Sequence, residues 1–118
     1  MPPRRWRYRI QDILDAIDRV ADYVDDLDEE SFAASSLVVD AVLRNLTVIG
    51  EATRYLPEEV RGAWPNVPWQ DMQGVRNIVV HEYFGVSLPI VWQTAKHDLP
   101  DLRVQLQAIL ENGDGESD

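Results

Sequence analysis

The chain contains no cysteine, only two histidines and no long uninterrupted apolar run. The lack of cysteine excludes a disulfide framework and any metal site built from thiolates. Two histidines are too few for a histidine-rich metal site, so we expect neither a metal nor another cofactor. No stretch approaches the roughly 18 apolar residues that cross a bilayer, so we expect no membrane partner. The N-terminal arginines are not followed by the apolar segment of a signal peptide, which predicts a cytoplasmic protein.

Basic residues are also scarce, with 11 lysines and arginines against 21 acidic residues and a formal net charge of −10. That balance argues against a broad, non-specific attraction to nucleic acid, because phosphate binding depends on lysine and arginine. Any nucleic-acid role must therefore rest on local positive sites. Four arginines are concentrated in residues 4–9, where they alternate with Trp6 and Tyr8. This arm could follow an RNA backbone, or it could be mobile or pack on acidic surface of its own dimer.

The length of 118 residues fits one domain, which we place at residues 1–112, followed by a flexible acidic tail at 113–118. Residues 10–27 carry an apolar stripe with alternating steps of three and four, which predicts an amphipathic helix. The opposite face is rich in aspartate and is interpreted as a solvated face, with a docking surface for a basic partner as the alternative. The stripe consists of Ile10, Ile13, Leu14, Ile17, Val20, Ala21, Val24 and Leu27.

A second helix is predicted to start with a cap at residues 28–31 and to end near Leu56, before Pro57. Its middle, residues 37–49, is apolar on more than one side. A helix of this kind is central to a bundle or forms half of a subunit interface, and we expect both roles.

Residues 57–69 hold three prolines and two tryptophans, which predicts an ordered loop with one helical turn after Pro57. Trp64 and Trp69 are interpreted as closing one end of the bundle. A third helix should run from 68–69 to about Gly85, and a fourth should begin at Pro89 and be broken or kinked at Pro100. With no strand pattern anywhere and about four helices expected, the chain is predicted to be all-α.

The predicted third helix carries the side chains that could take part in a reaction. They are Arg76, Asn77, His81 and, near the end of the helix, Tyr83. A histidine near neutral pKa can take the proton of an RNA 2′-hydroxyl or protonate the leaving 5′-oxygen. An arginine can hold the phosphate and stabilise charge that develops in the transition state, without a metal. Arg76 and His81 diverge by about 140° around one continuous helix, so we favour a site between two subunits over one within a subunit.

Spacing alone predicts catalysis weakly, because an arginine and a histidine five residues apart occur often by chance. Residues 74–86, GVRNIVVHEYFGV, followed by Val91 and Trp92, closely resemble the signature segment of the HepT-like proteins of the HEPN (higher eukaryotes and prokaryotes nucleotide-binding) superfamily. The resemblance covers nearly the whole chain from residue 8 to 110, including residues 41–46, 49–52, 68–69 and 98–102.

The resemblance implies a four- to five-helix up-and-down bundle of HEPN type that forms a homodimer, with the motifs of both subunits in one cleft. It implies a metal-independent endoribonuclease toxin of a toxin–antitoxin system, in which Arg76 and His81 are catalytic and Asn77 is a supporting residue. It further implies inhibition by a nucleotidyltransferase antitoxin of the MNT type, which transfers AMP to Tyr83.

Glu51 is a second supporting candidate, because a carboxylate on so apolar a helix needs a partner such as Arg76 or Arg44. A purely structural ion pair is the alternative for this residue. For the whole protein, the alternative is a non-catalytic HEPN module that binds a nucleotide or another protein.

Overall fold

The computed structural model describes residues 5–81 and 87–112, with the backbone alone for 76–81. Every regular element in these ranges is helical, and no strand occurs among them. The all-α prediction is therefore confirmed. The elements are α1 (Arg5–Val24), α2 (Glu29–Ala34), α3 (Ser36–Arg54), α4 (Glu58–Ala63), α5 (Trp69–His81), α6 (Leu88–Gln93), the π-helical segment η2 (Thr94–Asp98) and α7 (Leu99–Asn112).

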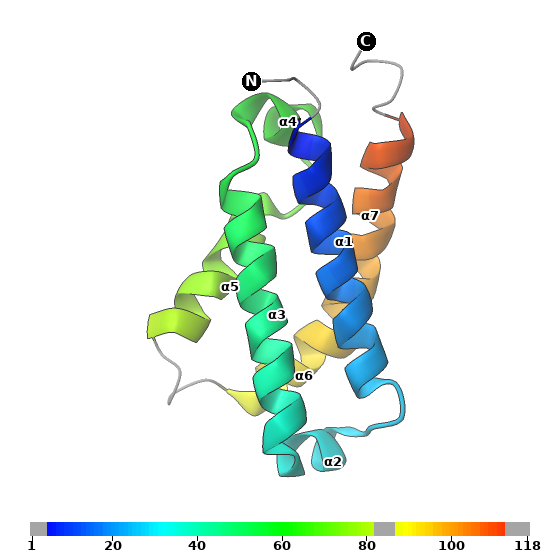
Figure 1. Cartoon of the computed structure of the whole chain (residues 1–118), viewed down its shortest axis with the longest axis vertical. Coiled ribbons are helices and arrows are strands. Elements are labelled where there is room, and N and C mark those ends of the chain that lie inside the picture. Colours follow the sequence, from blue (N-terminus) through cyan, green and yellow to red (C-terminus); the bar gives the residue numbers. More distant parts are fainter. Residues whose placement is uncertain (1–4, 82–86, 113–118) are drawn as a thin grey trace.

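The long helices run up and down beside one another, and the short α2 and α4 lie at opposite ends of the bundle (Figure 1). The start of α1 and the end of α7 lie at the same end as α4 (Figure 1). The core forms where α1 packs against α3 on one side and against α7 on the other. Its most completely buried side chains include Ile10, Ile13, Leu14, Ile17, Val20, Phe32, Val42, Ile49, Leu106 and Ile109.

Helix α1 begins at Arg5, so residues 5–9 are helical rather than part of a mobile arm. Arg7 is tied to the bundle because its Nη2 donates a hydrogen bond of 2.7 Å to the carbonyl oxygen of Leu110. The predicted stripe is confirmed from Ile10 to Val24 except at Ala21, which is exposed, whereas Ala16 is buried. Ala21 lies at the edge of the stripe, where the neighbouring helices do not cover it. The prediction is wrong at Leu27, which is partly buried but follows the end of α1 at Val24.

The single helix predicted from 28 to 56 is wrong, because the structure divides it into α2 and α3 at Ser35. Asp28 and Ser31 form a capping box at the start of α2, in which Asp28 accepts a hydrogen bond from the Ser31 backbone. Ser35 has an extended backbone, and its hydroxyl oxygen accepts a hydrogen bond of 3.3 Å from the Val38 N–H. This second cap starts a new helix, since a serine side chain competes well for backbone donors at a helix start.

The predicted disturbance near Pro100 is confirmed as the π-helical segment η2, which comes directly before α7. Proline at position 100 would press its ring against the carbonyl four residues earlier in a regular α-helix. The wider π turn relieves that clash, and the Leu99 N–H bonds to the Thr94 carbonyl oxygen instead. α6, η2 and α7 therefore form one bent helical column.

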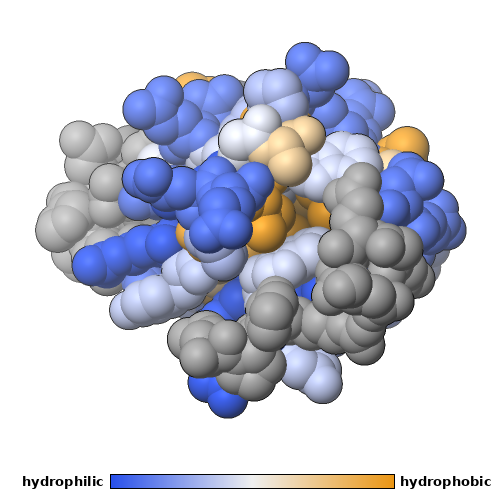
Figure 2. Space-filling model, turned by 90° about the horizontal axis from the view of Figure 1, so that it is seen from above, coloured by the Kyte–Doolittle hydropathy of each residue, from blue (hydrophilic) through white to orange (hydrophobic). Residues whose placement is uncertain are grey.

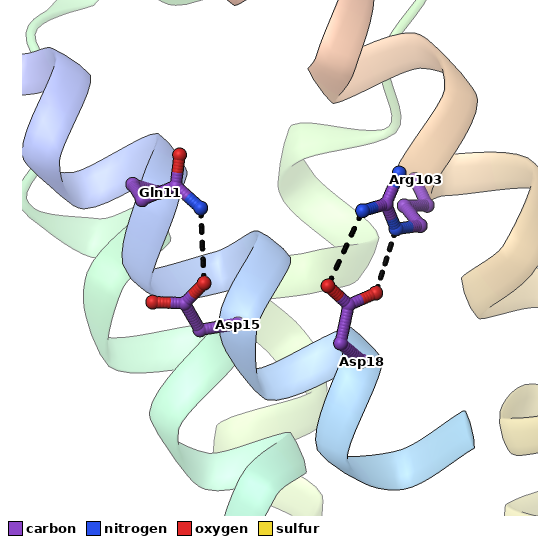
Figure 3. A network of polar contacts seen from close by, with 4 residues as sticks. All are labelled: Gln11, Asp15, Asp18 and Arg103. Atoms are coloured by element: carbon purple, nitrogen blue, oxygen red, sulfur yellow. Dashed lines mark hydrogen bonds and ion pairs between the residues drawn. The ribbon is translucent and has the colours of Figure 1, made fainter. Parts of the chain in front are cut away.

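A salt bridge between Asp18 and Arg103 joins α1 to α7 (Figure 3). Arg103 donates from Nε to Oδ1 at 2.7 Å and from Nη2 to Oδ2 at 3.2 Å. The hydrogen bonds from Arg103 hold the pKa of Asp18 below its ordinary value. Both side chains are about half exposed, so solvent screens the pair and its contribution to folding is modest, roughly 0–1 kcal/mol.

Candidate functional site

The start of α5 is anchored by Trp69, the first residue of that helix. The indole ring is buried, and its Nε1 donates hydrogen bonds to the carbonyl oxygens of Arg61 at 3.1 Å and Trp64 at 2.9 Å. Trp64 is partly buried and packs against the core. The interpretation that both tryptophans close one end of the bundle is thus confirmed. Their contacts fix the position from which α5 extends.

α5 packs extensively against α3, and it makes no comparable contact with another described element. Met72 is buried in this contact and Val75 is partly buried. Beyond Val75 the α-helical backbone continues through Arg76 and Asn77 to His81. The motif residues therefore lie on a helix that one neighbour, α3, holds in place.

The regular backbone of α5 fixes how the motif positions are arranged around the helix axis. With about 100° per residue, the Cα atoms of Asn77 and His81 lie within about 40° of each other, whereas those of Arg76 and His81 lie about 140° apart. The structure thus keeps Arg76 and His81 on one helix without placing them on one face. Tyr83 lies outside the described residues.

Glu51 lies on α3, is partly buried, and has its Oε1 3.9 Å from Nη1 of Arg54. Arg54 is a partner that the sequence reasoning did not name. Arg44, one of the two partners expected for Glu51, lines the same groove as Glu51. The side chain of Arg76, the other expected partner, is outside the described side chains.

A groove of about 640 Å³ lies between α1 and α3 and was not foreseen from the sequence. On each helix its lining residues recur at steps of three or four, as residues on one face do, so a periodic signal existed. The sequence could not indicate that the two polar rows face each other. The groove is lined by Arg9, Asp12, Asp15, Arg19, Arg44, Thr47, Val48, Glu51, Ala52 and Tyr55.

Within the groove, Arg19 is held by a short chain of hydrogen bonds. Its Nε donates to Oδ1 of the buried Asn45 at 2.9 Å, and Nδ2 of Asn45 donates to the carbonyl oxygen of Ala41 at 2.9 Å. Because the amide is fixed at both ends, the guanidinium group of Arg19 is oriented by α3 although it belongs to α1.

Neither a metal site nor a membrane-spanning helix is found among the described residues. Among them, no group of three or more histidine or acidic side chains is placed to hold a metal ion. Within the same part of the chain, no helix combines the length and the apolar character needed to cross a membrane.

Comparison with known proteins assigns the family. Residues 13–109 match the family model described as "Ribonuclease HepT-like". The chain belongs to the HepT-like ribonuclease family. This confirms the resemblance seen in residues 74–86, and it is consistent with the helical bundle.

Relatives from two organisms match over most of their length. A Methanocaldococcus jannaschii protein named "Putative RNase" is 34% identical over 112 residues, covering 95% of this chain and 97% of the relative. Another from the same organism with the same designation is 36% identical over 109 residues, covering 92% and 100%. The "Probable ribonuclease HepT" of Thermococcus cleftensis is 31% identical over 100 residues, covering 85% and 91%. No solved structure gives a significant match.

The anchoring of α5 by Trp69 is testable by Trp69→Phe, which keeps a buried ring but removes the indole donor. We expect a loss of about 1–2 kcal/mol in the free energy of unfolding, measured with urea, because two carbonyl oxygens lose their partner. Trp92→Phe is the control, since it makes the same change at a partly buried ring that packs on Phe32. Equal losses in the two variants would contradict a specific role for the indole hydrogen bonds.

Proposed function

We propose that this chain is a metal-independent endoribonuclease, the toxin of a type II toxin–antitoxin system acting in the cytoplasm. Membership of the HepT-like ribonuclease family is the observation that carries the proposal. The names of the relatives agree with it. The proposal assigns catalysis to Arg76 and His81 on α5.

The proposed reaction uses the nucleophile that RNA itself supplies. The 2′-hydroxyl oxygen attacks the adjacent phosphorus, the bond from phosphorus to the 5′-oxygen breaks, and a 2′,3′-cyclic phosphate and a 5′-hydroxyl end result. His81 takes the 2′-hydroxyl proton or delivers one to the leaving oxygen. Arg76 binds the phosphate oxygens, where negative charge grows in the transition state. Asn77 acts as a supporting residue beside this pair, and Glu51 acts as one from α3, where it lies 3.9 Å from Arg54.

The proposed active form is a homodimer with two symmetric sites in one cleft, each built from residues of both subunits. The Cα atoms of Arg76 and His81 lie about 140° apart around α5, so a pair drawn from two copies is easier to assemble than a pair within one. Among the described elements α5 packs mainly on α3, which leaves part of its surface for a partner. Exposed apolar side chains at the starts of α3 and α6, Leu37 and Ile90, support such an interface.

The net charge of −10 favours a second candidate, a non-catalytic module that binds a nucleotide or a protein. Such a module would bind RNA or nucleotide without degrading either. Incubation with labelled RNA separates the two candidates, because only the ribonuclease produces shorter fragments.

The catalytic assignment predicts that the wild-type protein cleaves labelled RNA in the presence of EDTA. Arg76→Ala and His81→Ala should each lower the cleavage rate by about 100-fold or more, because each removes a group that acts in the transition state. The measurement is the initial rate on a labelled transcript, with the melting temperature confirming that each variant folds. Val104→Ala, at an exposed position of α7 outside the residues that resemble the signature segment, serves as an active control. Cleavage that stops with EDTA, or that survives both motif substitutions, would refute the assignment.

We further propose that an MNT-type nucleotidyltransferase antitoxin inhibits this protein by transferring AMP from ATP to Tyr83. The hydroxyl oxygen of Tyr83 would attack the α-phosphorus, and pyrophosphate would leave. A nucleotide attached two residues after His81 would occupy space that the RNA substrate needs. The family assignment supports this proposal, and the resemblance at residues 74–86 supplies the tyrosine.

The modification predicts a specific change in intact mass. Coexpression with an MNT-type nucleotidyltransferase should add one or more adenylyl groups to the wild-type chain and should suppress its RNA cleavage. Tyr83→Phe should stay at its unmodified mass and remain active, whereas Tyr23→Phe should be modified like the wild type. An unchanged mass for the wild-type chain under coexpression would overturn this mode of control.

A further inference from the structure

The groove between α1 and α3 stands out because several cations of an acidic protein meet there. Arg9, Arg19 and Arg44 line it, and Arg54 lies beside its Tyr55. Other basic side chains are engaged elsewhere: Arg103 by Asp18, Arg7 by the Leu110 carbonyl, Arg61 by Gln73 and Lys96 by the Trp92 ring. Three carboxylates also line the groove, so its formal charges balance, but in a chain of net charge −10 it is a place where arginines, on which phosphate binding depends, are concentrated.

An aromatic ring is placed among these cations. Tyr55 is 59% exposed although it lines the groove, and the guanidinium carbons of Arg9 and Arg54 lie 5.2 and 5.7 Å from its ring centroid. Because these guanidinium groups lie over the ring, a nucleic-acid base would stack on Tyr55 by taking the place of one of them, which would leave that cation close to the adjoining phosphates. Figure 2, which looks onto the end of the bundle where α1 begins, shows largely polar surface around a small apolar area.

Acidic side chains share the groove and restrict where a phosphate can bind. Asp15 accepts a hydrogen bond of 2.9 Å from Gln11 (Figure 3), and Glu51 lies 3.9 Å from Arg54. Asp12 also lines the groove, on the same helix as Arg9 and Arg19. A polyanion would therefore contact the arginines while being repelled by the aspartates, so its affinity should be set by the difference between the two.

We propose that the groove between α1 and α3 binds a single-stranded segment of the RNA substrate, away from the scissile phosphate. Arg9 and Arg44 contact phosphates, Arg19 is oriented by Asn45 for the same purpose, and a base stacks on Tyr55. α3 forms one wall of the groove and also carries α5, so a strand that crosses α3 reaches the motif helix. The identity of the ligand as substrate rests on the proposed ribonuclease function.

The first test measures binding of a fluorescent single-stranded RNA of about ten nucleotides to the non-cleaving His81→Ala protein by anisotropy. Adding Tyr55→Ala should weaken binding about tenfold, whereas Tyr23→Ala, an exposed tyrosine of α1 outside the groove, should change it less than twofold. Arg9→Gln and Arg44→Gln should each lower the slope of log affinity against log salt by about 0.7, and Lys96→Gln should leave it unchanged. Equal effects for groove and control variants would overturn the proposal.

The second test removes a negative charge from the groove, because this change should affect the binding of RNA and of a basic protein segment in opposite directions. Asp12→Asn removes negative charge from the groove, so it should strengthen RNA binding about two- to fivefold; a basic protein segment would instead bind the variant more weakly. Asp25→Asn is the control, because it makes the same change at an exposed aspartate outside the groove. Weaker RNA binding by Asp12→Asn, or an equal gain in the control, would refute an RNA groove.

The third test is kinetic and uses the protein with His81 intact. Tyr55→Ala should raise KM for a long RNA about tenfold with little change in kcat, because a remote contact holds substrate and transition state equally. A fall in kcat at unchanged KM would contradict a binding role.

The ribonuclease proposal and the groove proposal can be refuted separately. A wild-type protein that binds RNA through the groove but never cleaves it refutes the ribonuclease proposal and leaves the groove standing. Cleavage with unaltered kinetics in the Tyr55, Arg9 and Arg44 variants refutes the groove and leaves the ribonuclease standing.

Discussion

The packing of α1 against α3 is the contact on which the other features of this molecule depend. The aliphatic stripe of α1 lies on α3, and α3 in turn holds α5. Because α5 has no second extensive neighbour among the described elements, its packing on α3 sets the position of the motif. The same packing brings two polar rows face to face above the core and so creates the groove with Arg9 and Tyr55. One apolar interface therefore supports both the candidate catalytic helix and the candidate binding groove.

The negative charge of the chain is unevenly distributed over the structure. Much of the negative charge of α1 lies on its exposed face, while Asp18 is neutralised by Arg103. Electrostatic attraction decreases within about 10 Å at ordinary ionic strength, so a cluster of arginines can act locally in a protein of opposite net charge. A net charge of −10 therefore does not by itself prevent RNA from binding at the groove, and such binding should depend strongly on salt.

Local sequence signals predicted much of this fold. The stripe from Ile10 to Val24 indicated α1, and Pro68 with Trp69 indicated the start of α5, because periodicity and proline placement act over a few residues. The interruption at Ser35 was missed, since an apolar run continues on both sides of it and only the backbone shows a second cap. The ion pair of Glu51 with Arg54 was missed because both Arg44 and Arg76 were plausible partners by spacing.

The candidate site was predicted only in part from the sequence. Arg76, Asn77 and His81 were found from chemistry and resemblance, and their separation around the axis follows from the helix that the structure describes. The groove was not found, because it depends on side chains of α1 and α3 that meet only after folding. Tyr55 gave no signal alone, since an exposed tyrosine near a helix end is common and only its arginine neighbours make it a stacking surface.

The central claim is that Arg76 of one subunit acts with His81 of the other, and mixed dimers test it most directly. Arg76→Ala and His81→Ala chains with different tags would be coexpressed, and the mixed dimers isolated through both tags. The account predicts roughly half of the wild-type cleavage rate, because one of the two symmetric sites is intact. Dimers of wild type with the double variant should be inactive, since no site then has both groups. Inactivity of the first mixture with activity of the second would contradict the account.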